Sequence, residues 1–323
     1  MNVRRKLLTA LALLPAGLMS GALAQRPGGP ARVGYLAGAS QSDGALQSLR
    51  DGMREVGHVE GKTYVIVARS GDFTRMPRLV EELVAERIDV LVSRGQVTEF
   101  AKAARSLVPV VFAFSGDPVE AGFADSLRKP GLNMTGITFM ALELSAKRIE
   151  VLKELLPKAT RIALLSNPEH AGEMAEYRVT DDAARRVGAA ITRYLVHNAK
   201  DLEATYPAIR ASGADAMIVF PDALTFARRK EIAEFAARAR IPSMYGWTEY
   251  VESGGLVSYG PAVDENYKTV AVMVDKILKG TPAGNIPIEQ VRKIGLTLNM
   301  AAARSLGLSV PQSILLRADR VIE

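Results

Sequence analysis

The sequence predicts an α/β fold of two doubly wound lobes, each with a parallel sheet at its centre. Strand-like and helix-like segments alternate along most of the chain. The strand-like segments are runs of aliphatic and β-branched residues without polar alternation, which is typical of strands that helices cover on both faces. The chain has 323 residues, and at about 150 residues per domain this length suggests two domains.

The first half predicts four strands separated by three helices. In the first helix Leu49 and Met53 lie on one face, Ser42 or Asp43 can cap the start, and Gly57 ends it. The expected strands are 32–37, 63–68, 89–93 and 110–114, and the expected helices are 43–56, 77–86 and 98–106.

The pattern then restarts, and the two halves resemble copies of each other. A strand at 89–92 precedes a helix and then Val108-Pro109, whereas a strand at 215–219 precedes a helix and then Ile241-Pro242. We interpret these units as two similar lobes that lie side by side. The expected helices of the second half are 142–156, 174–187, 202–211 and 225–240, and its strands are 161–166, 192–196, 216–220, 242–245 and 256–259.

Residues 1–24 have the layout of a secretory signal peptide. Basic Arg4-Arg5-Lys6 precedes an apolar stretch over 7–14, and Ala22-Leu23-Ala24 forms a small-residue cleavage site before Gln25. The apolar stretch is too short to span a bilayer. The paired arginines leave twin-arginine export open beside the general route. We expect cleavage after Ala24 and a periplasmic protein, which is not a lipoprotein because the chain has no cysteine.

The composition excludes several kinds of chemistry. Without cysteine there is no thiol catalysis, thiolate-bound zinc or iron–sulfur cluster. The histidines, His58, His170 and His197, lack metal-ligand spacing, and the glycine motifs of dinucleotide and phosphate loops are missing. We therefore expect no metal, no cofactor and no catalytic residue. The formal charge is +6, and loss of the three basic leader residues leaves about +3, which does not favour nucleic-acid binding.

Candidate ligand-binding residues lie in loops at the carboxyl ends of the predicted strands, where open α/β sheets bind ligands. A cleft between the lobes is expected to be lined by Ser40, Arg94, Gln96, Ser115 and Asp117 from the first lobe and by Asn167, Asp222, Tyr245, Trp247 and Tyr259 from the second. Ser40 and Asp222 can instead cap helices, and Asp117 can shape a turn. Tyr245 and Trp247 can instead pack at the rim.

Several short motifs match one known family. They are Gly57–Lys62, Ser115–Val119, Pro130–Gly136, Leu144–Arg148, Met244–Gly246, Gly254–Gly260, Val274–Gly280 and Leu316–Asp319. On these motifs, which extend over nearly all of the mature chain, the protein resembles the ABC-transporter substrate-binding proteins of the tryptophan-binding-like type, a branch of the periplasmic type I binding proteins. The resemblance implies two lobes that are joined by three hinge crossings and close on a small solute. It implies a first lobe of residues 31–141 plus 262–284 and a second of 142–261 plus 285–323.

Two stretches at the expected cleft depart from the family pattern. Arg94-Gly95-Gln96 stands where the family usually has a Gly-Thr or Gly-Ser turn. Asn167-Pro168-Glu169-His170 stands where it often has Asn-Pro-x-Asn-Pro. The ligand of a relative therefore does not transfer directly to this chain.

We interpret the chain as a monomeric solute-binding protein that delivers an amino acid, with aromatic ones among the candidates, or a related compound to an inner-membrane ABC permease. Asp222 is expected to pair with a ligand ammonium. A ligand carboxylate is expected to be held by Ser40, Gln96 and Ser115. The ligand side chain is expected to pack on Tyr245, Trp247 or Tyr259. A periplasmic sensor that docks on a receptor and an exported α/β enzyme are the alternatives.

Overall fold

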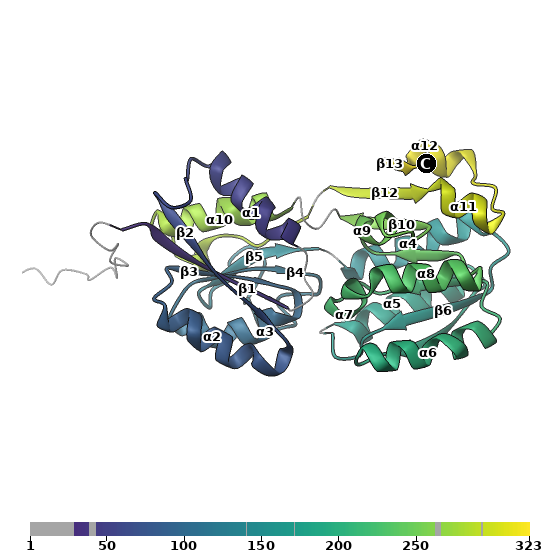
Figure 1. Ribbon diagram of the computed structural model, residues 1–323, viewed down its shortest axis with the longest axis horizontal. Helices are drawn as coiled ribbons and strands as arrows, with labels where there is room; N and C mark the ends of the chain where they lie inside the picture. The colour runs from purple at the N-terminus through teal and green to yellow at the C-terminus, as the bar shows by residue number, and fades with distance from the viewer. Residues whose placement is uncertain (1–28, 39–42, 140, 171, 262–265, 292) are drawn as a thin grey trace, which may run out of the picture.

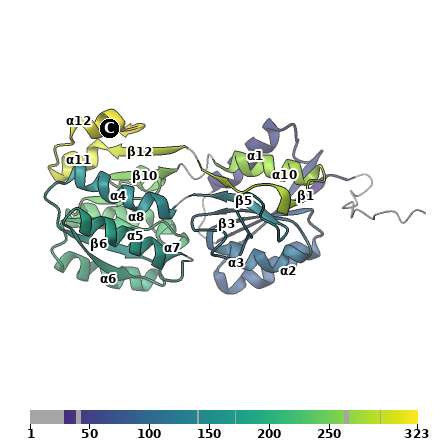
Figure 2. The same cartoon turned by 180° about the vertical axis from the view of Figure 1, so that it is seen from behind.

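The computed structural model describes residues 29–38, 43–139, 141–170, 172–261, 266–291 and 293–323 (Figure 1). The predicted signal peptide and Ser40 lie outside the described residues. Two lobes lie side by side, and each is a twisted sheet covered by helices on both faces (Figures 1 and 2). The α/β class with two predominantly parallel sheets is confirmed. None of the described helices is long and apolar enough to cross a membrane.

The first lobe contains a six-stranded sheet in the order β11-β5-β4-β3-β1-β2. Helices α1 and α10 cover one face, and α2 and α3 cover the other (Figure 1). The strands are β1 (Ala31–Gly38), β2 (Tyr64–Gly71), β3 (Val90–Arg94), β4 (Val110–Phe114), β5 (Met134–Thr138) and β11 (Glu289–Gln290). The helices are α1 (Asp43–Glu55), α2 (Met76–Ala85), α3 (Thr98–Ala101) and α10 (Tyr267–Leu278), with short 3-10 turns at Phe73–Arg75, Gly95–Val97, Lys102–Ser106 and Ala283–Asn285.

The second lobe contains a seven-stranded sheet in the order β13-β12-β10-β9-β8-β6-β7. Its strands are β6 (Arg161–Ser166), β7 (Ala190–Leu195), β8 (Ala216–Val219), β9 (Ser243–Tyr245), β10 (Val257–Pro261), β12 (Ile294–Asn299) and β13 (Arg320–Ile322). Its helices are α4 (Ala141–Leu155), α5 (Glu173–Arg186), α6 (Ala199–Ala211), α7 (Ala223–Ala227), α8 (Arg229–Ala239), α9 (Thr248–Glu252), α11 (Met300–Leu306) and α12 (Gln312–Arg317).

The chain passes between the lobes three times. It crosses between β5 and α4, between β10 and α10, and between β11 and β12. Strand β10 leads out of the second lobe and β12 leads back into it, so these two neighbours are antiparallel, with Val257 opposite Leu298. The other pairings are parallel, as Val33 with Val90 in the first lobe shows.

The predicted boundary between residues 284 and 285 is too early. Strand β11 pairs with β5, and Glu289 lies opposite Ile137, so the chain remains in the first sheet as far as Gln290. Both side chains of β11 are exposed. A two-residue strand with exposed side chains has no hydrophobic pattern that sequence reasoning can detect.

Some elements differ from the prediction. Strand β5 was not predicted because Thr135 and Gly136 break its apolar pattern, although all five of its residues are buried. Gly136 is needed there, since a Cβ atom would lie 2.1 Å from the Phe112 carbonyl oxygen. The predicted helix over 225–240 is broken at Arg228 into α7 and α8. The predicted helix over 98–106 is one short α-helix followed by a 3-10 turn.

Candidate ligand-binding site

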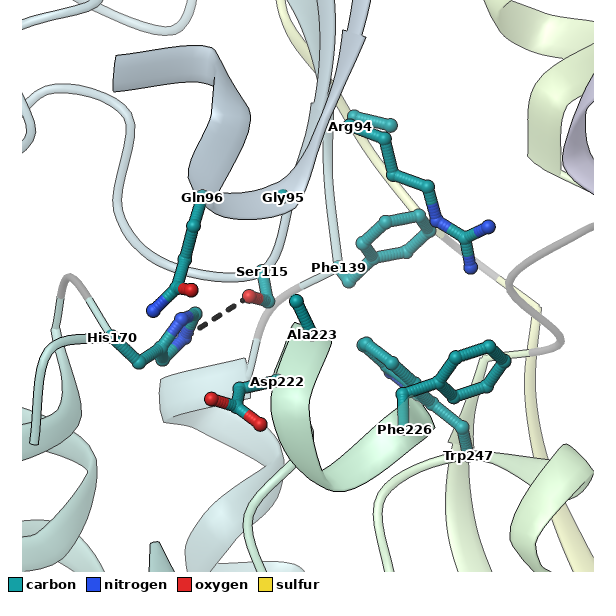
Figure 3. Close-up of a pocket in the computed structure, with 11 residues that line it drawn as sticks. Arg94, Gly95, Gln96, Ser115, Phe139, His170, Asp222, Ala223, Phe226 and Trp247 are labelled. Carbon is teal, nitrogen blue, oxygen red and sulfur yellow. Dashed lines mark hydrogen bonds between the residues drawn. The ribbon is translucent and has the colours of Figure 1, made fainter. Parts of the chain in front are cut away.

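A hollow lies between the two lobes (Figure 3). The first lobe lines it with Arg94, Gly95, Gln96, Ala113, Ser115 and Phe139, and the second with His170, Asp222, Ala223, Phe226 and Trp247. Most of these residues follow the carboxyl ends of β3, β4, β5, β6, β8 and β9, where backbone and side chains from both sheets converge. The hollow is therefore where the sequence placed the cleft.

Asp222 provides a buried carboxylate. It follows β8 and caps α7, where its Oδ1 accepts a hydrogen bond from the Thr225 backbone N–H at 2.6 Å. The Thr225 hydroxyl oxygen accepts in return from the Asp222 N–H at 3.2 Å. Asp222 is only 3% exposed, yet its Oδ2 has no hydrogen-bond partner among the described residues. A buried carboxylate oxygen without a donor is costly, so this atom calls for a donor that the described residues do not supply.

Ser115 and His170 join the lobes at one end of the hollow. Ser115 Oγ, directly after β4, lies 3.1 Å from His170 Nε2, and both residues are buried. Nδ1 of His170 and Nε2 of Gln96 are buried without a hydrogen-bond partner among the described residues. Figure 3 shows the Gln96 amide, the His170 ring and the Ser115 hydroxyl gathered at this end.

Aromatic rings form the opposite wall. Trp247 stands edge-on to Phe226, with ring centroids 5.2 Å apart, and to Phe139 of the first lobe at 6.5 Å. Arg94 also lies on this side, with its guanidinium carbon 5.4 Å from the centroid of the Phe226 ring (Figure 3). An apolar wall with a few polar groups at one end suits a ligand with a polar head and a flat apolar side chain.

Five of the predicted residues line this hollow, namely Arg94, Gln96, Ser115, Asp222 and Trp247. Their contact with a ligand stays a prediction. Asp222 is both the predicted helix cap and part of the lining of the hollow, because Oδ1 accepts from the Thr225 N–H while Oδ2 has no partner among the described residues.

Two predicted polar residues shape turns instead. Asp117 is exposed, and its Oδ1 accepts from the backbone N–H groups of Val119 and Glu120 at 2.7 and 3.3 Å. Asn167 is buried, and its Oδ1 accepts from the Glu169 N–H at 3.0 Å in the turn that carries His170. Both side chains lie outside the lining of the main hollow.

The two predicted tyrosines also lie away from the hollow. Tyr245 is fully buried in the second lobe and stacks on Tyr250 at 4.9 Å, and burial raises the pKa of its hydroxyl. Tyr259 is half-buried, and its backbone carbonyl accepts from Arg148 Nε at 3.0 Å. Strand periodicity decides this outcome, because side chains alternate faces along a strand and a one-residue difference sends a ring into the core.

Sequence reasoning missed three large side chains that line the hollow, namely Phe139, His170 and Phe226. Phe139 follows β5, which was not predicted, and Phe226 belongs to a predicted helix of which no residue was singled out for the site. His170 stands in one of the two stretches that depart from the family pattern, and this departure was the available signal.

A buried ion pair between Arg148 and Glu176 lies near His170 in the second lobe. Arg148 Nη1 lies 3.3 Å from Glu176 Oε1, which also accepts from the Ser145 hydroxyl at 3.0 Å. Burial raises the pKa of Glu176, and the Arg148 charge opposes that shift. The same arginine holds the Tyr259 carbonyl on β10, so it ties α4 and α5 to the strand that leads to the second crossing.

Comparison with known proteins gives the family. The family model described as ABC transporter substrate binding protein matches residues 38–322. The chain belongs to this family of ABC-transporter substrate-binding proteins. Members are solute-binding proteins, and within the described residues no group of three or more acidic or histidine side chains could hold a metal ion.

Three relatives of this substrate-binding protein illustrate the comparison. A tyrosine-binding protein of Clostridioides difficile (strain R20291) is 21% identical over 271 residues, which are 82% of this chain and 76% of the relative. A conserved domain protein of Vibrio cholerae is 26% identical with a TM-score of 0.83, over 90% of this chain and 99% of that one. An ABC domain from Streptococcus pneumonia in complex with L-Trp is 23% identical with a TM-score of 0.83, over 91% and 100%. These likenesses match the type I periplasmic binding fold.

Proposed function

We propose that this substrate-binding protein captures an aromatic amino acid between its lobes and delivers it to an ABC permease. The observation that carries the proposal is Asp222 Oδ2, a buried carboxylate oxygen without a partner among the described residues, in a hollow with an aromatic wall. A ligand ammonium would supply both the charge and the hydrogen bonds that this oxygen lacks.

The other groups in the hollow suit the rest of an amino acid. The Gln96 amide, and the Ser115 hydroxyl when it accepts from His170, can both donate to a carboxylate. Phe139, Phe226 and Trp247 offer ring edges and faces to an aromatic side chain. The names of two relatives, one tyrosine-binding and one bound to L-Trp, support the same ligand class.

The proposal includes export and a transport partner. Removal of residues 1–24 would leave a periplasmic protein that begins at Gln25 and works as a monomer, without a cofactor and without nucleic acid. N-terminal sequencing of the periplasmic protein tests the cleavage. An intact Met1 on that protein would contradict it.

Calorimetric titration of purified protein tests the ligand class. L-tryptophan, L-tyrosine and L-phenylalanine are the probes, with L-leucine as the control for the aromatic ring and 3-indolepropionate as the control for the ammonium. We expect at least one aromatic amino acid to bind and both controls to bind much more weakly. At a hundredfold excess over its Kd, the bound ligand should add about 2.7 kcal/mol to the free energy of unfolding. Equal binding of 3-indolepropionate would contradict the ammonium role of Asp222.

Delivery is tested with the cognate permease and ATPase in proteoliposomes. Uptake of the radiolabelled amino acid should require this protein. A ligand that binds without supporting uptake would favour a sensor that docks on a receptor.

A further inference from the structure

His170 bridges the two lobes, and one of its ring nitrogens has no partner among the described residues. Its Nε2 lies 3.1 Å from Ser115 Oγ of the first lobe, and the residue is 5% exposed. Its Nδ1 is buried without a hydrogen-bond partner among the described residues, as is Asp222 Oδ2 in the same hollow. Two unpartnered atoms thus lie in one polar region of the site (Figure 3).

Either ring nitrogen of a neutral His170 can carry the proton, and the contact with Ser115 fits both forms. With the proton on Nε2, the ring donates to Ser115 Oγ and Nδ1 presents a lone pair to the hollow. The polar end then offers two acceptors, one of them charged.

We propose that Asp222 Oδ2 and neutral His170 Nδ1 together hold the ligand ammonium, and that a proton on His170 releases the ligand. This proposal rests on the proposed function, because it requires an amine-bearing ligand in this hollow. A primary ammonium has three N–H donors and can serve both acceptors at once. A protonated ring would convert Nδ1 into a donor, place a second cation beside the ammonium and compete with it for Asp222.

Several other charged groups lie around His170, and two of them, Arg94 and Glu176, are buried. Glu176 on α5 is paired with Arg148 of α4, and Glu173 is paired with Arg193 at 2.8 Å. A smaller hollow lies beside the first and shares His170 with it. The charged residues that line either hollow are Arg94, Asp117, Glu120, Glu176 and Asp222. Of these, Arg94 is stacked over Phe226, and Asp117 and Glu120 are exposed. Asp222 is therefore the carboxylate of the main hollow that an ammonium would neutralise, and Glu176, whose charge interacts with that of His170, is a second carboxylate near a protonated ring.

Titration calorimetry between pH 8 and pH 5 tests the proposal, with L-tryptophan and L-tyrosine as probes. If only the neutral form of His170 binds the ligand, the Kd should rise at least several-fold as the pH falls over this range. In His170→Asn the amide keeps an acceptor but takes up no proton, so its Kd should change less than about threefold. His197→Asn is the matched control, since His197 is an exposed histidine that faces Glu169 on the surface, and it should follow the wild-type profile.

Each result decides a different point. Parallel pH profiles of the wild type and His170→Asn, or tighter binding in acid, would overturn the role of His170 and leave the proposed function intact. Failure of every aromatic amino acid to bind at any pH would overturn both proposals.

Should His170→Asn fail to fold, wild-type protein gives the answer by NMR. The ring signals of His58 and His197 are identified with single variants, which leaves that of His170, since the chain has three histidines. Ligand should move the His170 titration to lower pH. An unmoved or raised midpoint would overturn the proposal.

Discussion

The loops after β3 and β8 occupy the same place in two similar lobes and bring opposite chemistry to the hollow. After β3, Gly95 adopts a left-handed φ of 59° and turns the chain so that Gln96 places an amide there. After β8, Asp222 caps α7 with one oxygen and leaves the other unpartnered among the described residues. The first lobe therefore offers donors, and the second offers acceptors and most of the aromatic wall. A ligand that satisfies both must bridge the lobes, which couples binding to closure.

Asp222→Asn removes the charge of the second lobe and is expected to have the largest effect. The loss of one partner of a buried, hydrogen-bonded ion pair costs roughly 2–5 kcal/mol, or about 30-fold to several-thousand-fold in affinity. Asn caps helices about as well as Asp, so the melting temperature of the ligand-free protein should not change. Calorimetry beside thermal melting measures both. Wild-type affinity in Asp222→Asn would show that Asp222 only caps α7. The difference between donors in the first lobe and acceptors in the second would then play no part in ligand binding.

Trp247→Ala removes the ring that contacts Phe226 in its own lobe and Phe139 across the lobes. A central aromatic anchor is typically worth about 2 kcal/mol or more, so affinity for an aromatic amino acid should fall about 30-fold. Tyr245→Phe is the matched control, because that ring lies in the core and its loss of a hydroxyl should leave the Kd nearly unchanged. Equal losses in both variants would place the ligand against β9 rather than in the hollow.

Ser115→Ala removes the hydrogen bond that joins the lobes through His170. One such bond contributes about 1 kcal/mol, which corresponds to a roughly fivefold rise in Kd. Small-angle scattering of the liganded variant should still show compaction, since the bridging ligand remains. A liganded variant that stays extended would mean that Ser115 and His170, rather than the ligand, hold the lobes together.

Asp117→Asn is expected to have the smallest effect. The carboxylate accepts two backbone N–H groups of its own loop, and an amide oxygen can replace it. The Kd should change less than about twofold, and stability should change by at most about 1 kcal/mol. A tenfold loss of affinity would show that Asp117, in the loop after β4, contacts the ligand through its charge in addition to the contact from Ser115.

The sequence by itself determined the alternation of strands and helices, the division into two lobes and the loops that carry the site. These follow from hydrophobic period, helix caps and the position of polar residues at strand ends, which are local properties. It also identified Asp222 as a candidate both for the cap of a helix and for the lining of the cleft. An acidic residue near the end of a buried strand can take both positions, as Asp222 does at the start of α7.

Only the tertiary structure decided which of the loop side chains face the hollow. Tyr245 ends strand β9 and packs in the core, whereas Trp247 follows the strand, where strand alternation no longer sets its direction, and lines the hollow. The pairing of Ser115 with His170 joins residues 55 positions apart on different lobes, and no local pattern marks it. Whether an oxygen or nitrogen is left without a partner is a property of everything packed around it, and therefore the unpartnered atoms of Asp222 and His170 became visible only in the folded chain.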